Sequence, residues 1–138
     1  MTDIIADPAV YELLKEFAGG NVFADQAPDG QEAPFIVYNE VDFSTIKVLR
    51  GTSSGPVNAY FRIDAYERDP YAAKILGKKI RDKLDAFIGV VEHGENSPKD
   101  TVDIKGISFQ NGASLTDQFE KPLLYRRTGV YLVKYQES

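Results

Sequence analysis

A two-residue alternation that changes into a helical repeat at Asp69-Pro70 constrains the fold more than any other stretch of this chain. Within residues 57–65 the odd positions are apolar, and the even positions carry polar groups. Side chains of a strand point alternately to its two faces, so this pattern predicts a strand with one buried and one polar face.

A long helix is predicted directly after that strand. Asp69 can accept hydrogen bonds from the first free backbone N–H groups, and the fixed φ of Pro70 suits the first helical position. On a helical wheel, one side carries Ala73, Leu76, Ile80, Leu84, Phe87 and Ile88. The helix should therefore share a core with the strand and end near Gly89. Gly77 lies beside this apolar stripe, which predicts the close approach of another backbone there.

The rest of the chain supplies one more helix and three more strands. Asp7-Pro8 repeats the helix start, and this first helix should end at Gly19-Gly20. Strands are predicted over residues 35–43, over residues 102–109 with a bulge at Gly106, and over residues 123–135. Val22-Phe23 is a candidate short edge strand.

The segments between these elements are rich in polar residues, Gly and Pro, and are predicted to be loops or turns. They are residues 25–34, 44–56, 90–100 and 110–121. The predicted order is α-β-β-α-β-β. This order favours an α+β fold, an antiparallel β-sheet with two helices packed on one face. A chain of 138 residues is the size of one domain, so residues 1–138 are expected to form a single domain.

The composition excludes several classes of function. There is no cysteine, so disulfides, thiolate chemistry and cysteine-ligated metals are impossible. The apolar runs are short, and no basic segment precedes a long apolar stretch at the N-terminus; neither a membrane span nor a secretory signal is predicted. The net charge of −5 argues against binding nucleic acid through many phosphate contacts.

No catalytic, cofactor-binding or metal-binding residue is predicted. The single histidine, His93, lies in a polar turn, where an exposed loop residue is favoured over a member of a catalytic triad. Two carboxylate clusters are candidates for metal ligation, but neither has the spacing of a calcium loop. They are Asp25, Asp29 and Glu32, and Asp64, Glu67 and Asp69.

Basic residues of the long helix resemble a surface for nucleic acid or membranes. Acidic residues interrupt them at i,i+4 spacing, as in the pairs Lys78–Asp82 and Arg81–Asp85, so a solvated face is favoured. Arg126 and Arg127 are neighbours in a predicted strand and should point to opposite faces. The segment 51–55 lacks the lysine of a phosphate-binding loop and precedes a strand; it is predicted to be a hairpin tip.

The tyrosines leave two interpretations open. Tyr60 shares the polar strand face with Arg62 and Asp64, whereas Tyr66 and Tyr71 flank the turn into the helix. Aromatic residues at such positions either cover the side chains of their neighbours or become buried by another subunit.

Several sequence segments together resemble the tail-completion, or tail-terminator, proteins of long-tailed bacteriophages and prophages. They are the helix over residues 10–14, the loop ending in residues 33–38, the block of residues 61–66, and the helix with Ala72-Ala73 and Leu76 ahead of Ile80 and Leu84. The resemblance covers roughly residues 10–88.

The resemblance implies a structural protein that is not an enzyme and needs no cofactor. Such a subunit is expected to form a homo-oligomeric ring, a hexamer, at the head-proximal end of the tail tube. There it stops tube growth and joins the tail to the head. The implied partners are the tail tube protein and the head-tail connector protein, and DNA passes the lumen without specific binding. The implied location is the virion tail, after assembly in the host bacterial cytoplasm and without a membrane.

Contacts with neighbouring subunits or partners are expected at the outer strand face and at two loops. The expected residues are Tyr60, Arg62 and Tyr66 on the strand, Thr52 and Ser53 in the first loop, and Leu115 and Phe119 in the second. Two alternatives to the tail-terminator function remain open. One is a head-completion module of the virion, and the other is a small ligand-binding domain or enzyme.

Overall fold

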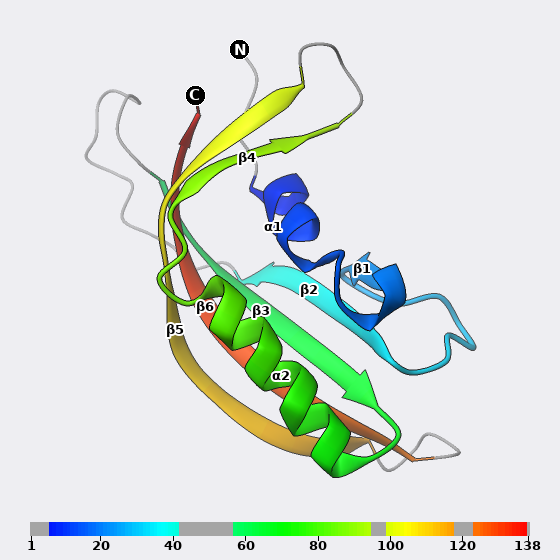
Figure 1. The fold of residues 1–138 in the computed structure, drawn as a ribbon. Helices are drawn as coiled ribbons and strands as arrows, with labels where there is room; N and C mark the ends of the chain where they lie inside the picture. Colours follow the sequence, from blue (N-terminus) through cyan, green and yellow to red (C-terminus); the bar gives the residue numbers. More distant parts are fainter. Residues whose placement is uncertain (1–5, 42–56, 95–98, 118–122, 138) are drawn as a thin grey trace.

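The computed structural model describes residues 6–41, 57–94, 99–117 and 123–137. These residues form a curled six-stranded sheet, and the two α-helices lie on its concave side (Figure 1). The elements are α1 (Asp7–Leu14), β1 (Val22–Ala24), β2 (Phe35–Val41), β3 (Val57–Glu67), α2 (Pro70–Leu84), β4 (Gly89–His93), β5 (Asp100–Asp117) and β6 (Leu124–Glu137). A short 3₁₀ helix, Ala18–Gly20, follows α1.

The strand order across the sheet is β1-β2-β3-β6-β5-β4. All neighbouring pairs are antiparallel except β1 and β2, which are parallel. The prediction of a purely antiparallel sheet is therefore wrong at this edge, whereas the short edge strand at Val22-Phe23 is confirmed. A strand of three residues contains too little of the alternation to reveal its direction.

β4 was not predicted, because residues 90–100 were interpreted as a polar turn region. The preceding helix also ends earlier than its apolar pattern suggests. The Asp85 carboxylate accepts a hydrogen bond of 3.0 Å from Phe109 N, and Ala86 turns the chain with φ 69°. Since α2 stops at Leu84, Ile88 leaves the helical face and is 71% exposed. Residues 89–93 are then free to pair with β5.

β5 is much longer than the strand predicted for this region, and residues 110–117 form strand rather than the predicted loop. These polar residues pair with β6 through backbone hydrogen bonds, which do not require apolar side chains. The register shifts between Ile104 and Gly106, as predicted, and again between Phe109 and Asn111. These irregularities interrupt the alternation that a sequence pattern relies on.

The two helix starts differ. Asp69 caps α2 as predicted, since its carboxylate accepts a hydrogen bond of 2.9 Å from Ala72 N. Asp7 is instead the first residue of α1, and the N-cap position is Ala6, which has no side-chain cap. α1 also ends at Leu14, short of the predicted Gly19-Gly20.

The main core fills the concave side of the sheet. Both helices bury their apolar faces in it, which confirms that they pack on one side. The largest fully buried side chains there include Leu14 of α1, Ile36 of β2, Phe61 of β3 and Ile80 of α2. A smaller cluster of Phe35, Val37 and Leu124 lies on the other face.

Candidate functional site

The outer face is the convex face of the sheet, which both helices leave uncovered in the described structure. The even residues of β3 lie on this face, opposite their register partners in β2 and β6. Its central residues are Tyr60, Arg62, Asp64 and Tyr66 of β3, Phe35, Val37 and Asn39 of β2, and Arg126, Thr128, Val130 and Leu132 of β6. The structure thus brings Tyr60, Arg62 and Tyr66 together on one face, as the alternation predicted.

A buried carboxylate organises the centre of the outer face. Asp64 is 1% exposed, and its Oδ1 accepts a hydrogen bond of 2.8 Å from Thr128 Oγ1. Its Oδ2 lies 3.3 Å from Arg62 Nε and 3.9 Å from an Arg126 guanidinium nitrogen. Asp64 therefore pairs with two arginine side chains. The Arg62 side chain that it orients remains 45% exposed. An ion pair with a buried carboxylate restricts the directions that a guanidinium group can take.

The Tyr66 side chain makes packing contacts within its own chain. Its ring stacks on Phe35 with 4.6 Å between the ring centroids, and the Arg126 guanidinium carbon lies 5.9 Å from the Tyr66 centroid. Tyr66 also packs against the small cluster around Phe35 and Leu124. Of the three predicted strand residues, Arg62 is the most exposed, while Tyr60 and Tyr66 are half-buried.

The predicted loop residues are described only in part. Thr52, Ser53 and Phe119 lie outside the described residues. Leu115 belongs to β5, opposite Arg126 in the register, so its predicted place in a loop is wrong.

The predicted site omitted Asp64, Arg126 and Thr128. The alternation of residues 57–65 already placed Asp64 on the same strand face as Arg62. What the sequence lacked was the register that sets Asp64 opposite Thr128, and Tyr66 opposite Arg126. A pairing register is a tertiary property that no single strand pattern contains.

The carboxylate side chains that were candidates for metal ligation do not come together around one point in the described ranges. In the described ranges, no three His, Asp or Glu side chains form a group that could hold a metal ion. Asp69 is engaged as a helix cap, and burial raises the pKa of the Glu67 carboxyl, with the charge of Asp69 adding to the effect. His93 ends β4 and is half-buried. No helix in the part of the chain that the structure describes is long and apolar enough to cross a membrane.

The basic residues have local partners. Lys78 pairs with Asp82 at 2.8 Å, as predicted. Arg81 instead lies over the ring of Phe109, with 4.1 Å from its guanidinium carbon to the ring centroid. Arg126 and Arg127 occupy opposite faces, because Arg126 approaches Asp64 on the outer face while Arg127 packs on α2.

The fold is that of a subunit found in a phage-like particle. It matches a chain of the solved structure "Virion of native gene transfer agent (GTA) particle" with a TM-score of 0.57 and 17% sequence identity. The match covers 93% of this chain and 92% of that chain. At this identity the likeness shows the shared fold alone. No curated protein matches the chain.

Residues 2–95 match the family model of tail completion protein gp17. The match spans more than half of the 138 residues, and the chain belongs to this family. The resemblance noted in the sequence is thereby confirmed. The family places the chain among the structural proteins of phage tail and head-tail assembly.

Proposed function

We propose that this protein forms a hexameric ring at the head-proximal end of a phage tail tube, where it stops tube growth and joins the tail to the head. Membership of the tail completion family supports the proposal. The partners are the tail tube protein and the head-tail connector protein. The protein acts without catalysis or a cofactor, becomes part of the virion tail after assembly in the host cytoplasm, and lets DNA pass without specific binding. The net charge of −5 is compatible with that passage.

The proposed mechanism is geometric. A head-to-tail interface uses two different surfaces of each subunit, and it closes into a ring when the rotation between neighbours divides a full turn. A closed ring on the end of a tube covers the surface to which the next tube subunit would bind. Tube length would then be fixed by a bound cap rather than by a chemical reaction.

The outer face is the surface we assign to subunit or tube contacts. The observation that carries this assignment is Arg62, which a buried Asp64 orients while nearly half of its side chain stays exposed. Half-buried Tyr60, Val130 and Leu132 surround it. Interfaces are enriched in Tyr and Arg, and a preoriented side chain loses less entropy on binding. Tyr66, Thr52, Ser53, Leu115 and Phe119 remain proposed contact residues.

The test is a double variant, Tyr60→Ala with Arg62→Gln. Arg62→Glu is less suitable, since it would place a second carboxylate beside Asp64. The variant should keep a folded monomer, as judged by thermal unfolding, but lose most of its ability to halt polymerisation of purified tube protein. The matched control is Tyr71→Ala with Lys79→Gln on the exposed surface of α2.

Three results distinguish the possible roles. A wild-type mass of about 92 kDa by light scattering, six times the 15.4 kDa of one chain, would support the hexamer. Full activity of the outer-face variant in halting tube growth would remove this face from the mechanism. Binding to purified connectors but not to tubes would instead favour a head-completion module.

A further inference from the structure

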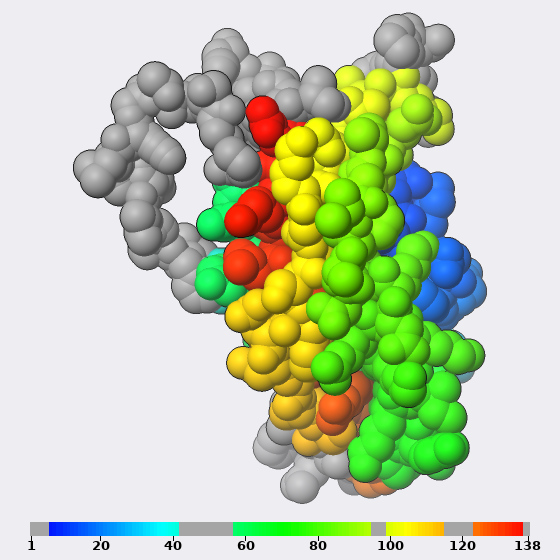
Figure 2. All heavy atoms as spheres, turned by 60° about the vertical axis from the view of Figure 1, so that its left-hand side comes forward, coloured from blue at the N-terminus to red at the C-terminus, as the bar shows by residue number. Residues whose placement is uncertain are grey.

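A groove of about 680 Å³ runs between α2 and the strands β5 and β6. Figure 2 shows α2 beside β5, with part of β6 visible between them. The side chains of Ile80, Phe109 and Tyr131 line its apolar part. Gly77 on α2 contributes no side chain to this space. The volume is within the range of sites that hold small ligands or a few side chains of a partner.

The rim of the groove is mainly basic. Lys74, Lys78, Arg81 and Arg127 line it, against Asp82 and Asp85. Lys78 and Asp82 form an ion pair that adds no net charge. Lys74, Arg81 and Arg127 then remain against Asp85, whose carboxylate accepts a hydrogen bond from Phe109 N. Lys74 is exposed and makes no ion pair with the residues described. The groove therefore offers positive charge to an incoming acidic group.

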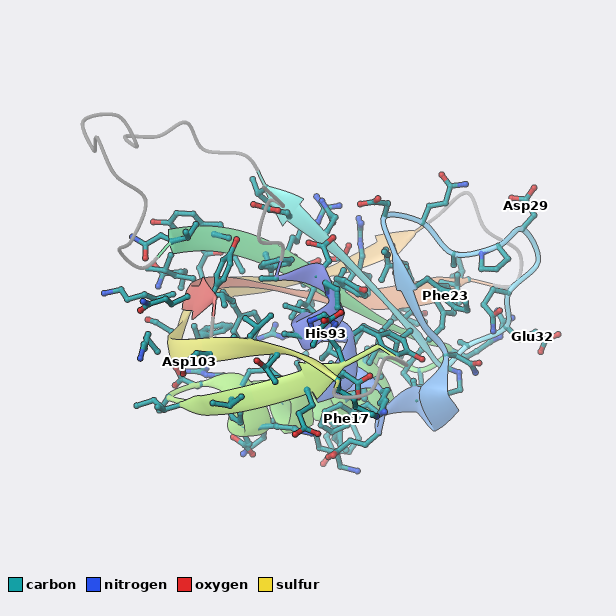
Figure 3. The ribbon with its side chains drawn as sticks, turned by 90° about the horizontal axis from the view of Figure 1, so that it is seen from above. Phe17, Phe23, Asp29, Glu32, His93 and Asp103 are labelled. Atoms are coloured by element: carbon teal, nitrogen blue, oxygen red, sulfur yellow. The ribbon has the colours of Figure 1, made fainter. Side chains whose placement is uncertain are left out.

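The loop between β1 and β2, residues 25–33, carries the opposite charge. Asp25, Asp29 and Glu32 are exposed, and the segment contains no basic residue. Within the described ranges, none of the three carboxylates forms an ion pair. Asp29 and Glu32 lie at one end of the molecule and point away from the sheet (Figure 3). The loop is shaped by its own backbone hydrogen bonds, including Gln31 N to Pro28 O at 3.1 Å.

The loop and the groove belong to different flanks of the subunit. The loop joins the two strands at the β1 edge of the sheet, whereas the groove lies over β6 and β5, towards the β4 edge (Figure 1). With α2 between them, the two surfaces of one chain do not meet. We infer that the groove of one subunit receives the acidic loop, residues 25–33, of a second copy of this chain.

This contact is head-to-tail, because it uses two different surfaces, and repetition of the same contact closes a ring when the rotation is right. The inference rests on the proposed ring and names the surfaces that build it. It leaves the outer face available for the tube or for other contacts between subunits. Charge attraction across the contact should make association weaken as the salt concentration rises.

Charge reversal on each surface tests the inference. The groove variant is Lys74→Glu with Lys78→Glu, and the loop variant is Asp29→Lys with Glu32→Lys. Each variant alone should weaken self-association by about tenfold or more at low salt, measured by light scattering over a range of protein concentration. An equimolar mixture of the two variants should recover association, since alternating subunits restore opposite charges at every contact. A chain carrying all four changes should recover it too.

The matched control is Lys79→Glu with Lys99→Glu, which changes the net charge by the same amount as the groove variant but lies outside the groove. It should associate like the wild-type protein. If the wild-type protein forms an oligomer and the reversed variants still form it, the inference is wrong while the ring stands. If the wild-type protein stays monomeric and a bis-maleimide fails to link Lys74→Cys to Asp29→Cys, the inference is also wrong. Inhibition of tube growth then decides the proposed function separately.

Discussion

Gly77 on α2 lies against the aliphatic part of the Arg127 side chain on β6, so closely that a Cβ atom at position 77 would overlap Arg127 Cγ. The guanidinium group of Arg127 continues across the concave face and donates a hydrogen bond of 2.9 Å to Ser114 Oγ on β5. The close approach predicted at Gly77 therefore exists, but a side chain makes it rather than another backbone. Arg127 connects α2, β6 and β5 through this contact.

Gly77→Ala is expected to destabilise the protein. Alanine would favour the helix by about 1 kcal/mol, but overlap with a side-chain atom close to the backbone costs about 1–3 kcal/mol. The net loss in the free energy of unfolding should be about 1 kcal/mol, measured by urea denaturation. In an Arg127→Ala background the same substitution should be neutral or stabilising. Equal effects in both backgrounds would show that the two positions are not coupled.

The sequence predicted the regular elements whose pattern is local. The alternation of β3 and the start of α2 at Asp69 need only neighbouring residues, and both are confirmed. The end of α2 depends on Phe109, a residue 24 positions away that donates to Asp85. Likewise, the polar residues 110–117 form strand because β6 lies beside them. Such long-range determinants are absent from a local pattern.

Asp69→Ala should remove the cap of α2. Its carboxylate accepts a hydrogen bond from Ala72 N that no other group of the helix can replace, so the expected loss in the free energy of unfolding is about 1 kcal/mol. Asp69→Ser retains a cap acceptor and should lose only a few tenths of a kcal/mol. Chemical denaturation of both variants checks the difference, and an equally large loss for the serine variant would contradict the capping role.

Asp64→Asn should destabilise the protein more than a substitution of its exposed partner Arg62. The change removes the charge that two arginines share and weakens the hydrogen bond from Thr128, at an expected cost of about 2 kcal/mol. Arg62→Ala should cost less than about 1 kcal/mol, because its side chain is nearly half exposed. Urea denaturation midpoints of the two variants provide the comparison. If Arg62→Ala were the more destabilising change, Asp64 would not be the centre of the outer face.

The sequence predicts which residues of the candidate site share a face of one strand, but not which residues of other strands they contact. Tyr60 and Arg62 follow from the alternation of β3 alone, and the structure places them on one face. The roles of Asp64 and Tyr66 follow from contacts with residues far away in the sequence and on other strands, such as Thr128 and Phe35. Composition cannot supply these pairings, because they require the strand order and its register.

Asp7→Asn should make the protein more stable at neutral pH. Burial raises the pKa of the Asp7 carboxyl, and the negative charge of Asp25 raises it further. Its Oδ1 is buried and has no hydrogen-bond partner among the described residues. A raised pKa in the folded state means that the protonated form is favoured on folding. The stability contributed by that proton is complete below the ordinary pKa of the carboxyl and is lost as the pH rises through the raised value.

The amide that replaces the carboxyl in this variant carries no charge at any pH, so the variant avoids this loss. We expect its free energy of unfolding to exceed that of the wild-type protein at pH 7, and the difference to vanish at pH values below the ordinary pKa of the carboxyl. Urea denaturation at several pH values measures the difference. Asp29→Asn, on an exposed part of the loop, should leave stability unchanged across the range and serves as the control. A difference for Asp7→Asn that grows towards low pH would have the wrong sign and would exclude a raised pKa at Asp7.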